Sequence, residues 1–443
     1  MFLFICCCCI QESHQWAPTP ELLQAETEFI KQFGKTKKEK RMLMKAFRVL
    51  KRWAKKKHLM HRNMYELERA LNQRGMAHTL FLHHIVEKVK KSTDQVISKV
   101  KSEISKAQQF FNPPIPKYDG PFYSKGSLAT WMNDLVLFIG DLPLNNLLIP
   151  GTHDSFTSKI VAESKIAPNA EEPIKKLNNV LKFYPKNVAN TVIANWARAQ
   201  SQSAYNQLVD GVRYLDIRLC RDKEIKDKVQ MLKTCHTFFD SPIEPILDNI
   251  ATFSKTKGKK EIIILDFNHL YDMDDSDHEY LFKVLKAKFG NLLADSTKFS
   301  PNSSLREFWR TTQRIIVLYD NENAVKKSQG LLWPQSKINS PWPNVQTTTD
   351  LYDKLSKSAQ SRSDTDKQFF VSQGLLTPNE KTIAAGLIAK PKSLLDAGDL
   401  WNPVVANWIA SGSLPRKKLN IVIVDNYSPL FVATLVEKNR KKI

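Results

Sequence analysis

The run Val212-Arg-Tyr-Leu-Asp-Ile-Arg218 belongs to a series of short, β-rich apolar segments that follow one another after residue 121. Helix-compatible stretches such as Tyr280–Phe289 separate these segments. Continuous apolar strands that alternate with helices predict a parallel sheet covered on both faces. Because about 320 residues hold at least six such segments, we expect a TIM-type (β/α)8 barrel with insertions, of class α/β, over residues 122–443. The other segments are Leu147–Ile149, Glu261–Phe267, Ile315–Tyr319, Phe369–Val371 and Asn420–Val424.

Polar residues follow the apolar segments, at the strand ends where barrel enzymes carry their active sites. Asp216 and Arg218 are two residues apart, so they share one face of the predicted strand. Each polar residue alone has an ordinary structural explanation, such as a turn, an ion pair or a helix cap. Their accumulation at the strand ends of one barrel favours a catalytic site. The set is His153, Asp154, Asp216, Arg218, His236, Asn268, His269, Asp425 and Tyr427.

These residue types suit the cleavage of a phosphodiester. That reaction needs a proton removed from the attacking oxygen, a proton delivered to the leaving oxygen, and charge offset on the phosphoryl oxygens. Two imidazoles such as His153 and His236 divide the first two tasks near neutral pH, each worth roughly 10²–10⁴ in rate. A guanidinium such as Arg218 suits the third task, because it is always charged and forked. No GxGxxG or GKS/T motif follows a strand, which argues against a nucleotide-binding fold.

The sequence resembles the X domain of phosphatidylinositol-specific phospholipase C over about residues 122–440. The resemblance rests on Leu147-Leu-Ile-Pro-Gly-Thr-His-Asp-Ser155, Gly211–Arg218, His236 and Val422–Asp425. A narrower resemblance, to the animal PI-PLC X-domain-containing proteins, rests on Trp196, Gln200, Gln207, Leu332–Pro334, Ser340–Pro343 and Leu376–Pro378. The fold that this resemblance implies is the PLC-like phosphodiesterase barrel.

The resemblance also implies roles for the matching residues. His153 would be the general base that takes the proton from the inositol 2-hydroxyl, and His236 the general acid that protonates the diacylglycerol oxygen. Arg218 would stabilise the phosphate, at a position that a calcium ligand holds in the calcium-dependent eukaryotic enzymes. We therefore expect a phosphatidylinositol-like phospholipid as substrate and neither a metal nor another cofactor.

The resemblance gives the remaining residues supporting roles. Asp425 would orient the base, while Asp154 and Asp216 would support Arg218 and the acid. Asn268, His269 and Tyr427 are the predicted substrate contacts. Where the bacterial enzymes have a substrate-binding lysine after the third strand, this chain has Asp266-Phe-Asn-His269, so its headgroup specificity is open.

The N-terminal part of the chain differs from the barrel in charge. Residues 1–110 hold 22 Lys and Arg against 10 Asp and Glu, an excess of about 12 of the chain's +21 charges. Apolar residues recur at helical spacing over residues 21–111, which predicts a basic helical hairpin. The Pro-rich stretch 112–121 is the predicted linker. The helices would pack on each other or on the barrel, or bind an anionic membrane surface.

The cysteines are unevenly placed. Cys6, Cys7, Cys8 and Cys9 lie in the apolar segment 1–20, and two acyl chains there would anchor the protein by S-palmitoylation. A signal peptide or a poorly ordered start are alternatives. Only Cys220 and Cys235 follow, which is no disulfide framework and favours a reducing compartment. We therefore expect a cytoplasmic protein peripheral on membranes.

The resulting prediction is a phospholipase C-like phosphoric diester hydrolase or lyase that uses two histidines, with an arginine in place of calcium. One alternative is a catalytically weak or inactive barrel that docks on membranes. The other is a nucleic-acid-binding protein directed by the basic segment, but no zinc-finger spacing or RNP-like motif supports a nucleic-acid partner.

Overall fold

The computed structural model describes residues 128–170, 186–363, 365–379, 382–383 and 390–440. The predictions for the Cys-rich start, the basic helical region and the linker fall outside these residues. Among the described helices, none is both long and apolar enough to cross a membrane.

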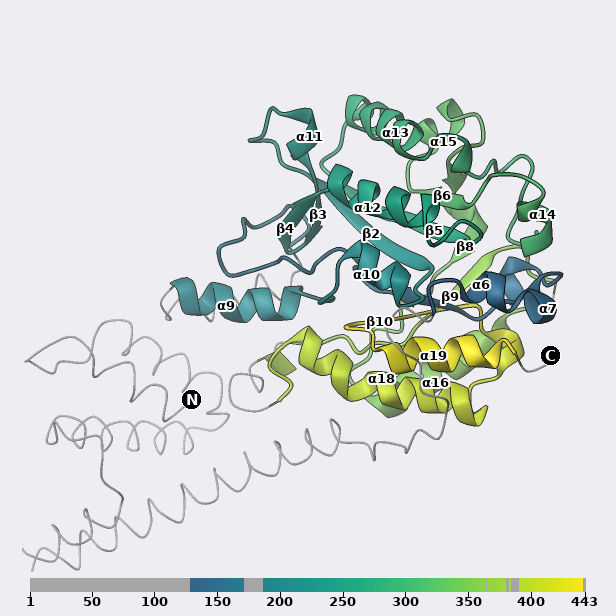
Figure 1. The fold of residues 1–443 in the computed structure, drawn as a ribbon. Coiled ribbons are helices and arrows are strands. Elements are labelled where there is room, and N and C mark those ends of the chain that lie inside the picture. Colours follow the sequence, from purple (N-terminus) through teal and green to yellow (C-terminus); the bar gives the residue numbers. More distant parts are fainter. Residues whose placement is uncertain (1–127, 171–185, 364, 380–381, 384–389, 441–443) are drawn as a thin grey trace, which may run out of the picture. The chain divides into compact units, whose positions relative to one another are not determined.

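A curled parallel sheet forms the centre of the fold (Figure 1). Its strands follow the spatial order β7-β6-β5-β2-β1-β10-β9-β8, and each neighbouring pair along this order is parallel. The two end strands have only two residues each and are consecutive in the chain. This arrangement confirms the predicted TIM-type barrel. The parallel strands are β1 (Ile149–Thr152), β2 (Tyr214–Arg221), β5 (Ile263–Tyr271), β6 (Ile315–Tyr319), β7 (Trp333–Pro334), β8 (Ile338–Asn339), β9 (Phe369–Gln373) and β10 (Ile421–Val424).

Helices cover the sheet, with α12, α13 and α15 on one side in Figure 1 and α16, α18 and α19 on another. Side-chain caps define several helix starts, because a Ser or Asp oxygen accepts an otherwise unpaired backbone N–H. Asp274 begins α13 in this way, Ser393 begins α18, and Ser428 begins α19. The helices are α6 (Trp131–Asp134), α7 (Val136–Ile139), α9 (Lys186–Ala197), α10 (Ala204–Val209), α11 (Lys228–Met231), α12 (Ile243–Lys255), α13 (Asp275–Phe289), α14 (Leu305–Trp309), α15 (Glu322–Lys327), α16 (Thr348–Ser361), α18 (Leu394–Ser411) and α19 (Pro429–Lys438).

An antiparallel hairpin, β3 (Leu232–His236) and β4 (Phe238–Pro242), extends the sheet from β2. The sequence did not predict these strands, since they are short and mix polar with apolar residues. The hairpin also carries a disulfide from Cys235 to Cys220 on β2. The scarcity of cysteine predicted no disulfide framework and favoured a reducing compartment, where disulfides are rare, so the pairing corrects the first of these expectations.

A buried ion pair holds the start of the described chain against the barrel. Arg213 Nε donates to Glu261 Oε2 at 2.9 Å, and both side chains are fully buried. The same carboxylate accepts the backbone N–H groups of Met132 and Asn133 at 3.2 and 3.1 Å. One buried carboxylate therefore joins Arg213, the residue before β2, to helix α6.

We expect Glu261→Gln to lower the free energy of unfolding by about 3–5 kcal/mol, because it leaves the buried Arg213 charge without its counter-ion. The measurement is urea unfolding followed by circular dichroism. Glu279→Gln is the control, since Glu279 pairs with Lys283 on the surface and should change stability by less than about 0.5 kcal/mol. Equal stability of wild type and Glu261→Gln would contradict this account of the ion pair.

Candidate active site

Four of the predicted residues come together, three of them at the C-terminal ends of β1, β3 and β10 and one within β2. His153 follows β1, Arg218 lies on β2, His236 ends β3, and Asp425 follows β10. Asp154, the neighbour of His153, lies among them and contacts both histidines and the arginine. The parallel strands β1, β2 and β10 direct their carboxyl ends to one edge of the sheet, and the antiparallel strand β3 places His236 beside them.

His153 is held on both of its ring nitrogens. Its Nδ1 lies 2.8 Å from Asp425 Oδ1. Its Nε2 lies 3.2 Å from Asp154 Oδ2 and 3.3 Å from Arg218 Nη2. Because a carboxylate only accepts, Nδ1 carries a proton toward Asp425. In the neutral ring Nε2 then accepts from Arg218, and in the charged ring it donates to Asp154.

The charges around His153 favour its protonated form. Burial by itself lowers the pKa, but the carboxylates of Asp154 and Asp425 outweigh it and raise the pKa of His153 to about 9. Burial raises the pKa of the Asp154 carboxyl. The Arg218 guanidinium and the two histidines outweigh burial and hold this pKa well below its usual value. Asp154 therefore stays ionised, and His153 must lose a proton before it acts as a base.

His236 is oriented by a backbone group. Its Nδ1 lies 2.7 Å from the carbonyl oxygen of Ala197, at the end of α9. A carbonyl only accepts, so this contact fixes the Nδ1–H tautomer and leaves Nε2 for proton transfer. Nε2 lies 3.6 Å from Asp154 Oδ2, and the His153 and His236 rings are 6.3 Å apart at their centres. The two imidazoles thus lie on either side of one carboxylate.

Arg218 is fixed by Asp154 through a 2.7 Å ion pair from Nε to Oδ1. Asp216 supports the loop that carries His153 and Asp154, since its Oδ2 accepts the backbone N–H of Asp154 at 2.9 Å. Its other oxygen accepts from Asn268 Nδ2 at 2.5 Å. The predicted supporting carboxylates are therefore placed around Arg218 and the loop that carries His153.

The backbone is strained directly after each of three site residues. Asp154, Thr237 and Asn426 have φ angles of 41°, 65° and 39°, and they follow His153, His236 and Asp425. A β-branched residue such as Thr237 rarely adopts this left-handed conformation. Such strain persists only where the surrounding structure holds it, and it gathers at functional sites.

The predicted substrate contacts fall into two groups. Asn268 and His269 lie at the end of β5, where Asn268 Oδ1 is 2.8 Å from His269 Nδ1. His269 is exposed, and partial desolvation together with the Arg218 charge lowers its pKa. Tyr427 is buried, and its hydroxyl donates to Asp210 at 3.0 Å. The geometry therefore leaves Asn268 and His269 beside the site, whereas the Tyr427 hydroxyl is engaged by a buried carboxylate.

Several positioning groups were not among the predicted site residues. Asn402 Nδ2 donates to the carbonyls of Asp425 and Asn426 at 2.9 and 2.8 Å. Gly398 lets helix α18 approach closely, because a Cβ there would lie 2.4 Å from the Asp425 carbonyl oxygen. Gln200 Nε2 donates to the carbonyls of both His153 and Val424 at 2.9 Å. A glycine inside a helical pattern costs about 1 kcal/mol relative to Ala, which was the one signal for Gly398.

Three of the predicted site residues could also hold a cation. One ligand atom each from His153, Asp154 and Asp216 lies within 4.8 Å of the others. The Arg218 guanidinium is paired with Asp154 in the same place, so a cation would have to compete with a fixed positive charge. Calcium normally takes six to eight oxygen ligands, and this group offers two carboxylates. The residues present fit the guanidinium better than a calcium ion.

The fold and the site define a class: a parallel β/α barrel with two histidines, an arginine and their supporting carboxylates at the strand ends. No protein-family profile matches the chain. PI-PLC X domain-containing protein 3 of Mus musculus is 30% identical over 313 residues, which cover 70% of this chain and 93% of that protein. PI-PLC X domain-containing protein 2 of Homo sapiens is 32% identical over 274 residues, 62% of this chain and 86% of that protein. The chain therefore belongs to the family of PI-PLC X domain-containing proteins.

Among solved structures, a phosphatidylinositol-specific phospholipase C from Listeria monocytogenes aligns with 71% of this chain and 99% of its own. The TM-score is 0.45 and the sequence identity is 19%.

Proposed function

We propose that the protein is a phospholipase C-type phosphodiesterase that cleaves a phosphatidylinositol-like lipid without calcium. The observation that carries the proposal is the pair of imidazoles, His153 on Asp425 and His236 on the Ala197 carbonyl, around the Arg218–Asp154 pair. Each imidazole is oriented through Nδ1, and its Nε2 faces Asp154.

The proposed reaction divides among three groups. Neutral His153 takes the proton of the inositol 2-hydroxyl at Nε2 as that oxygen attacks phosphorus, and its Nδ1–H stays on Asp425. His236, protonated at Nε2, delivers a proton to the diacylglycerol oxygen as the bond from phosphorus to that oxygen breaks. Arg218 offsets the charge on the phosphoryl oxygens, which is worth most inside a partly buried site.

The direct experiment is headgroup release from a panel of radiolabelled phospholipids, with His153→Ala as the matched control. We expect release from phosphatidylinositol by wild type and at most a hundredth of that rate from His153→Ala. If no lipid of the panel is cleaved by a correctly folded wild type, the barrel acts as a membrane-docking module and the proposal is wrong.

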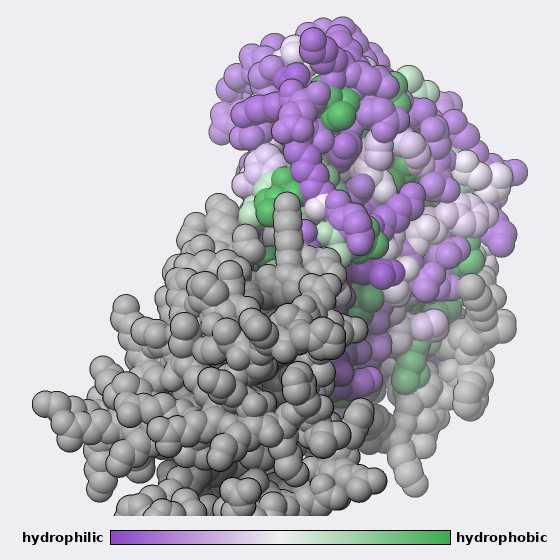
Figure 2. All heavy atoms as spheres, turned by 90° about the vertical axis from the view of Figure 1, so that its left-hand side faces the viewer, coloured by the Kyte–Doolittle hydropathy of each residue, from purple (hydrophilic) through white to green (hydrophobic). Residues whose placement is uncertain are grey.

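The proposal includes the membrane surface as a partner. The positive charges gathered in residues 1–110 support it, since each Lys or Arg near an anionic surface contributes about 1 kcal/mol. Figure 2 shows the barrel from the side where β3 and β4 lie, and the surface visible there is mainly hydrophilic with scattered apolar patches.

Vesicle binding that weakens with salt, and that falls after deletion of residues 1–110, is the expected result. Equal binding by the truncated protein would contradict it.

The surroundings of His153 predict the pH dependence of the reaction. We expect kcat/KM to rise as the pH approaches 9, because the free base forms as His153 passes its pKa of about 9, and to stop rising where His236 loses the proton that it must donate. Asp425→Asn removes one of the carboxylates that raise this pKa, so the rising limb should move to lower pH while the maximal rate falls. The check is a pH profile of both proteins.

The matched control for that profile is Asp399→Asn. Asp399 accepts from Asn426, the neighbour of Asp425, but it is not among the charges that shift His153. Its profile should rise over the same pH range as wild type. A rising limb that stays in place in Asp425→Asn would contradict the assignment of His153 as the base.

A further inference from the structure

We infer that the disulfide between Cys220 and Cys235 is a redox site that positions His236 for proton transfer. The inference rests on the proposed function and adds a condition to it: the site turns over substrate when the disulfide is formed and loses most of its turnover when it is reduced. No residue of the proposed acid/base chemistry is itself changed.

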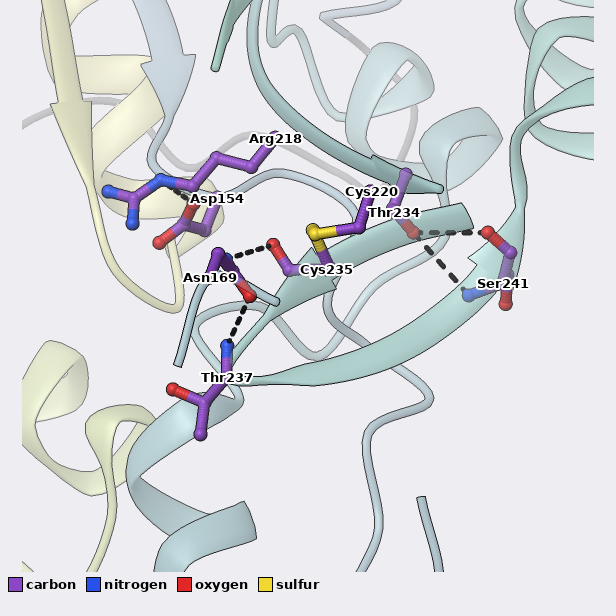
Figure 3. Close-up of a disulfide and its surroundings, with 8 residues drawn as sticks. All are labelled: Asp154, Asn169, Arg218, Cys220, Thr234, Cys235, Thr237 and Ser241. Atoms are coloured by element: carbon purple, nitrogen blue, oxygen red, sulfur yellow. Dashed lines mark hydrogen bonds and ion pairs between the residues drawn. A yellow bond between two sulfur atoms is a disulfide. The ribbon is translucent and has the colours of Figure 1, made fainter. Parts of the chain in front are cut away.

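The disulfide lies between the two strands that carry the arginine and the acid. Arg218 is two residues before Cys220 on β2, and His236 directly follows Cys235 on β3. The β2–β3 pairing runs only from Leu219 with Thr234 to Arg221 with Leu232. Arg218 and His236 thus both lie beyond the paired residues, and the Cys220–Cys235 bond links the strands next to them. Figure 3 shows this bond close to the ion pair of Arg218 and Asp154.

The disulfide also borders the site itself. Cys235 lines the same small cavity as Asp154, Arg218 and Thr234. Both cysteines are almost fully buried, so the bond is part of the packing beneath the site rather than a surface link. Movement of Cys235 would therefore change the wall against which the arginine and its carboxylate are packed.

Backbone strain makes the position of His236 depend on its neighbours. Thr237, the next residue, has a φ of 65°, which needs external support. Asn169 supplies part of it, since its Nδ2 donates to the Cys235 carbonyl at 3.3 Å and its Oδ1 accepts from the Thr237 N–H at 3.1 Å (Figure 3). The disulfide fixes Cys235 from the opposite strand. When the disulfide is reduced, Cys235 keeps its hydrogen bond to Asn169 but loses its link to β2. The Thr237 backbone is then free to relax, which would move His236 away from the Ala197 carbonyl.

The redox step is a two-electron exchange with a dithiol. The S–S bond breaks, Cys220 and Cys235 each gain one electron and one proton, and the dithiol reductant becomes a cyclic or protein disulfide. Thiols keep most cysteines reduced in the cytoplasm, where a disulfide forms transiently and serves as a sensor. In such a compartment, exchange with a disulfide oxidant, which takes the two electrons and two protons and becomes a dithiol, would switch the enzyme on. In an oxidising compartment the enzyme would stay on.

The test compares the oxidised full-length protein with the same protein treated with dithiothreitol, using phosphatidylinositol in mixed micelles. Alkylation and mass spectrometry report the state of Cys220 and Cys235, and circular dichroism reports the fold. We expect kcat to fall about 10-fold or more on reduction with KM little changed, because a misplacement of about 1 Å costs up to about 10²-fold. Reoxidation should restore kcat.

Two variants separate this disulfide from other effects of the reductant. Cys220→Ala/Cys235→Ala should have the low kcat of the reduced protein and no response to dithiothreitol. A protein in which Cys6–Cys9 are replaced by serine should respond as wild type does. A folded reduced protein or double variant with the kcat of the oxidised protein would overturn the inference.

A readout without turnover separates this inference from the proposed function. Histidine-selective NMR, with the His236 signal assigned from His236→Ala, should show that signal shifted between oxidised and reduced protein. If the oxidised protein cleaves no lipid but its His236 signal shifts on reduction, the proposed function is contradicted and the positional role of the disulfide is supported. An unchanged His236 signal would overturn the inference whatever the activity.

Discussion

We expect His153→Ala and His236→Ala each to lower phosphodiesterase turnover by at least about 10²-fold, because each removes one proposed proton-transfer group. Neither change removes a large apolar side chain, so both proteins should keep the wild-type circular dichroism spectrum. The measurement is the initial rate of headgroup release at saturating lipid. The two losses should not multiply in the double variant, since the residues act in one reaction.

His278→Ala is a matched control for the histidine variants. His278 is also buried, and its Nδ1 lies 2.8 Å from the Tyr319 hydroxyl, in a contact between α13 and β6. Its loss should lower stability while leaving turnover of the folded protein close to wild type. Near-normal turnover in folded His153→Ala or His236→Ala would refute the acid/base assignment.

Arg218→Lys lowers turnover by roughly 10²–10³-fold, the usual loss when one donor to the transition state is removed. Lysine keeps the charge but cannot contact Asp154 with Nε and a phosphoryl oxygen with its remaining nitrogens at the same time. Arg221→Lys is the control on the same strand, because Arg221 pairs with Asp274 and Asp277 instead. Equal rates of Arg218→Lys and wild type would remove the arginine from the mechanism.

The same arginine predicts the response to calcium. Activity should survive millimolar EGTA and should not increase with added calcium, since the guanidinium already neutralises the carboxylate that a calcium ion would need. Loss of activity in EGTA with recovery in calcium would return the protein to the metal-dependent class.

The sequence predicted the parts of the site that follow parallel strands. His153, Arg218 and Asp425 could be placed together because an apolar run that predicts a parallel strand ends just before or at each of them, and such ends meet on one side of a barrel. The apolar runs also located most strands, although β1 begins at Ile149 rather than Leu147 and extends to Thr152. The position of each of these strands is encoded by a continuous apolar segment of the local sequence.

The remaining parts depend on contacts that no local pattern encodes. The β3–β4 hairpin alternates polar and apolar residues only briefly, so its pairing with β2 and the Cys220–Cys235 bond could not be foreseen. The partner of His236 is a backbone carbonyl, which any residue at position 197 would provide. Tyr427 was predicted in the site because it follows the last strand, but its hydroxyl donates to the buried Asp210.

The central claim is that His153 takes a proton and His236 gives one, and a change of leaving group tests it most directly. A lipid alkoxide needs a proton to leave, whereas the p-nitrophenolate of a p-nitrophenyl inositol phosphate leaves without one. The account predicts that this substrate restores much of the turnover of His236→Ala and none of that of His153→Ala. Equal rescue of both variants, or of neither, would contradict the assignment of the acid and the base.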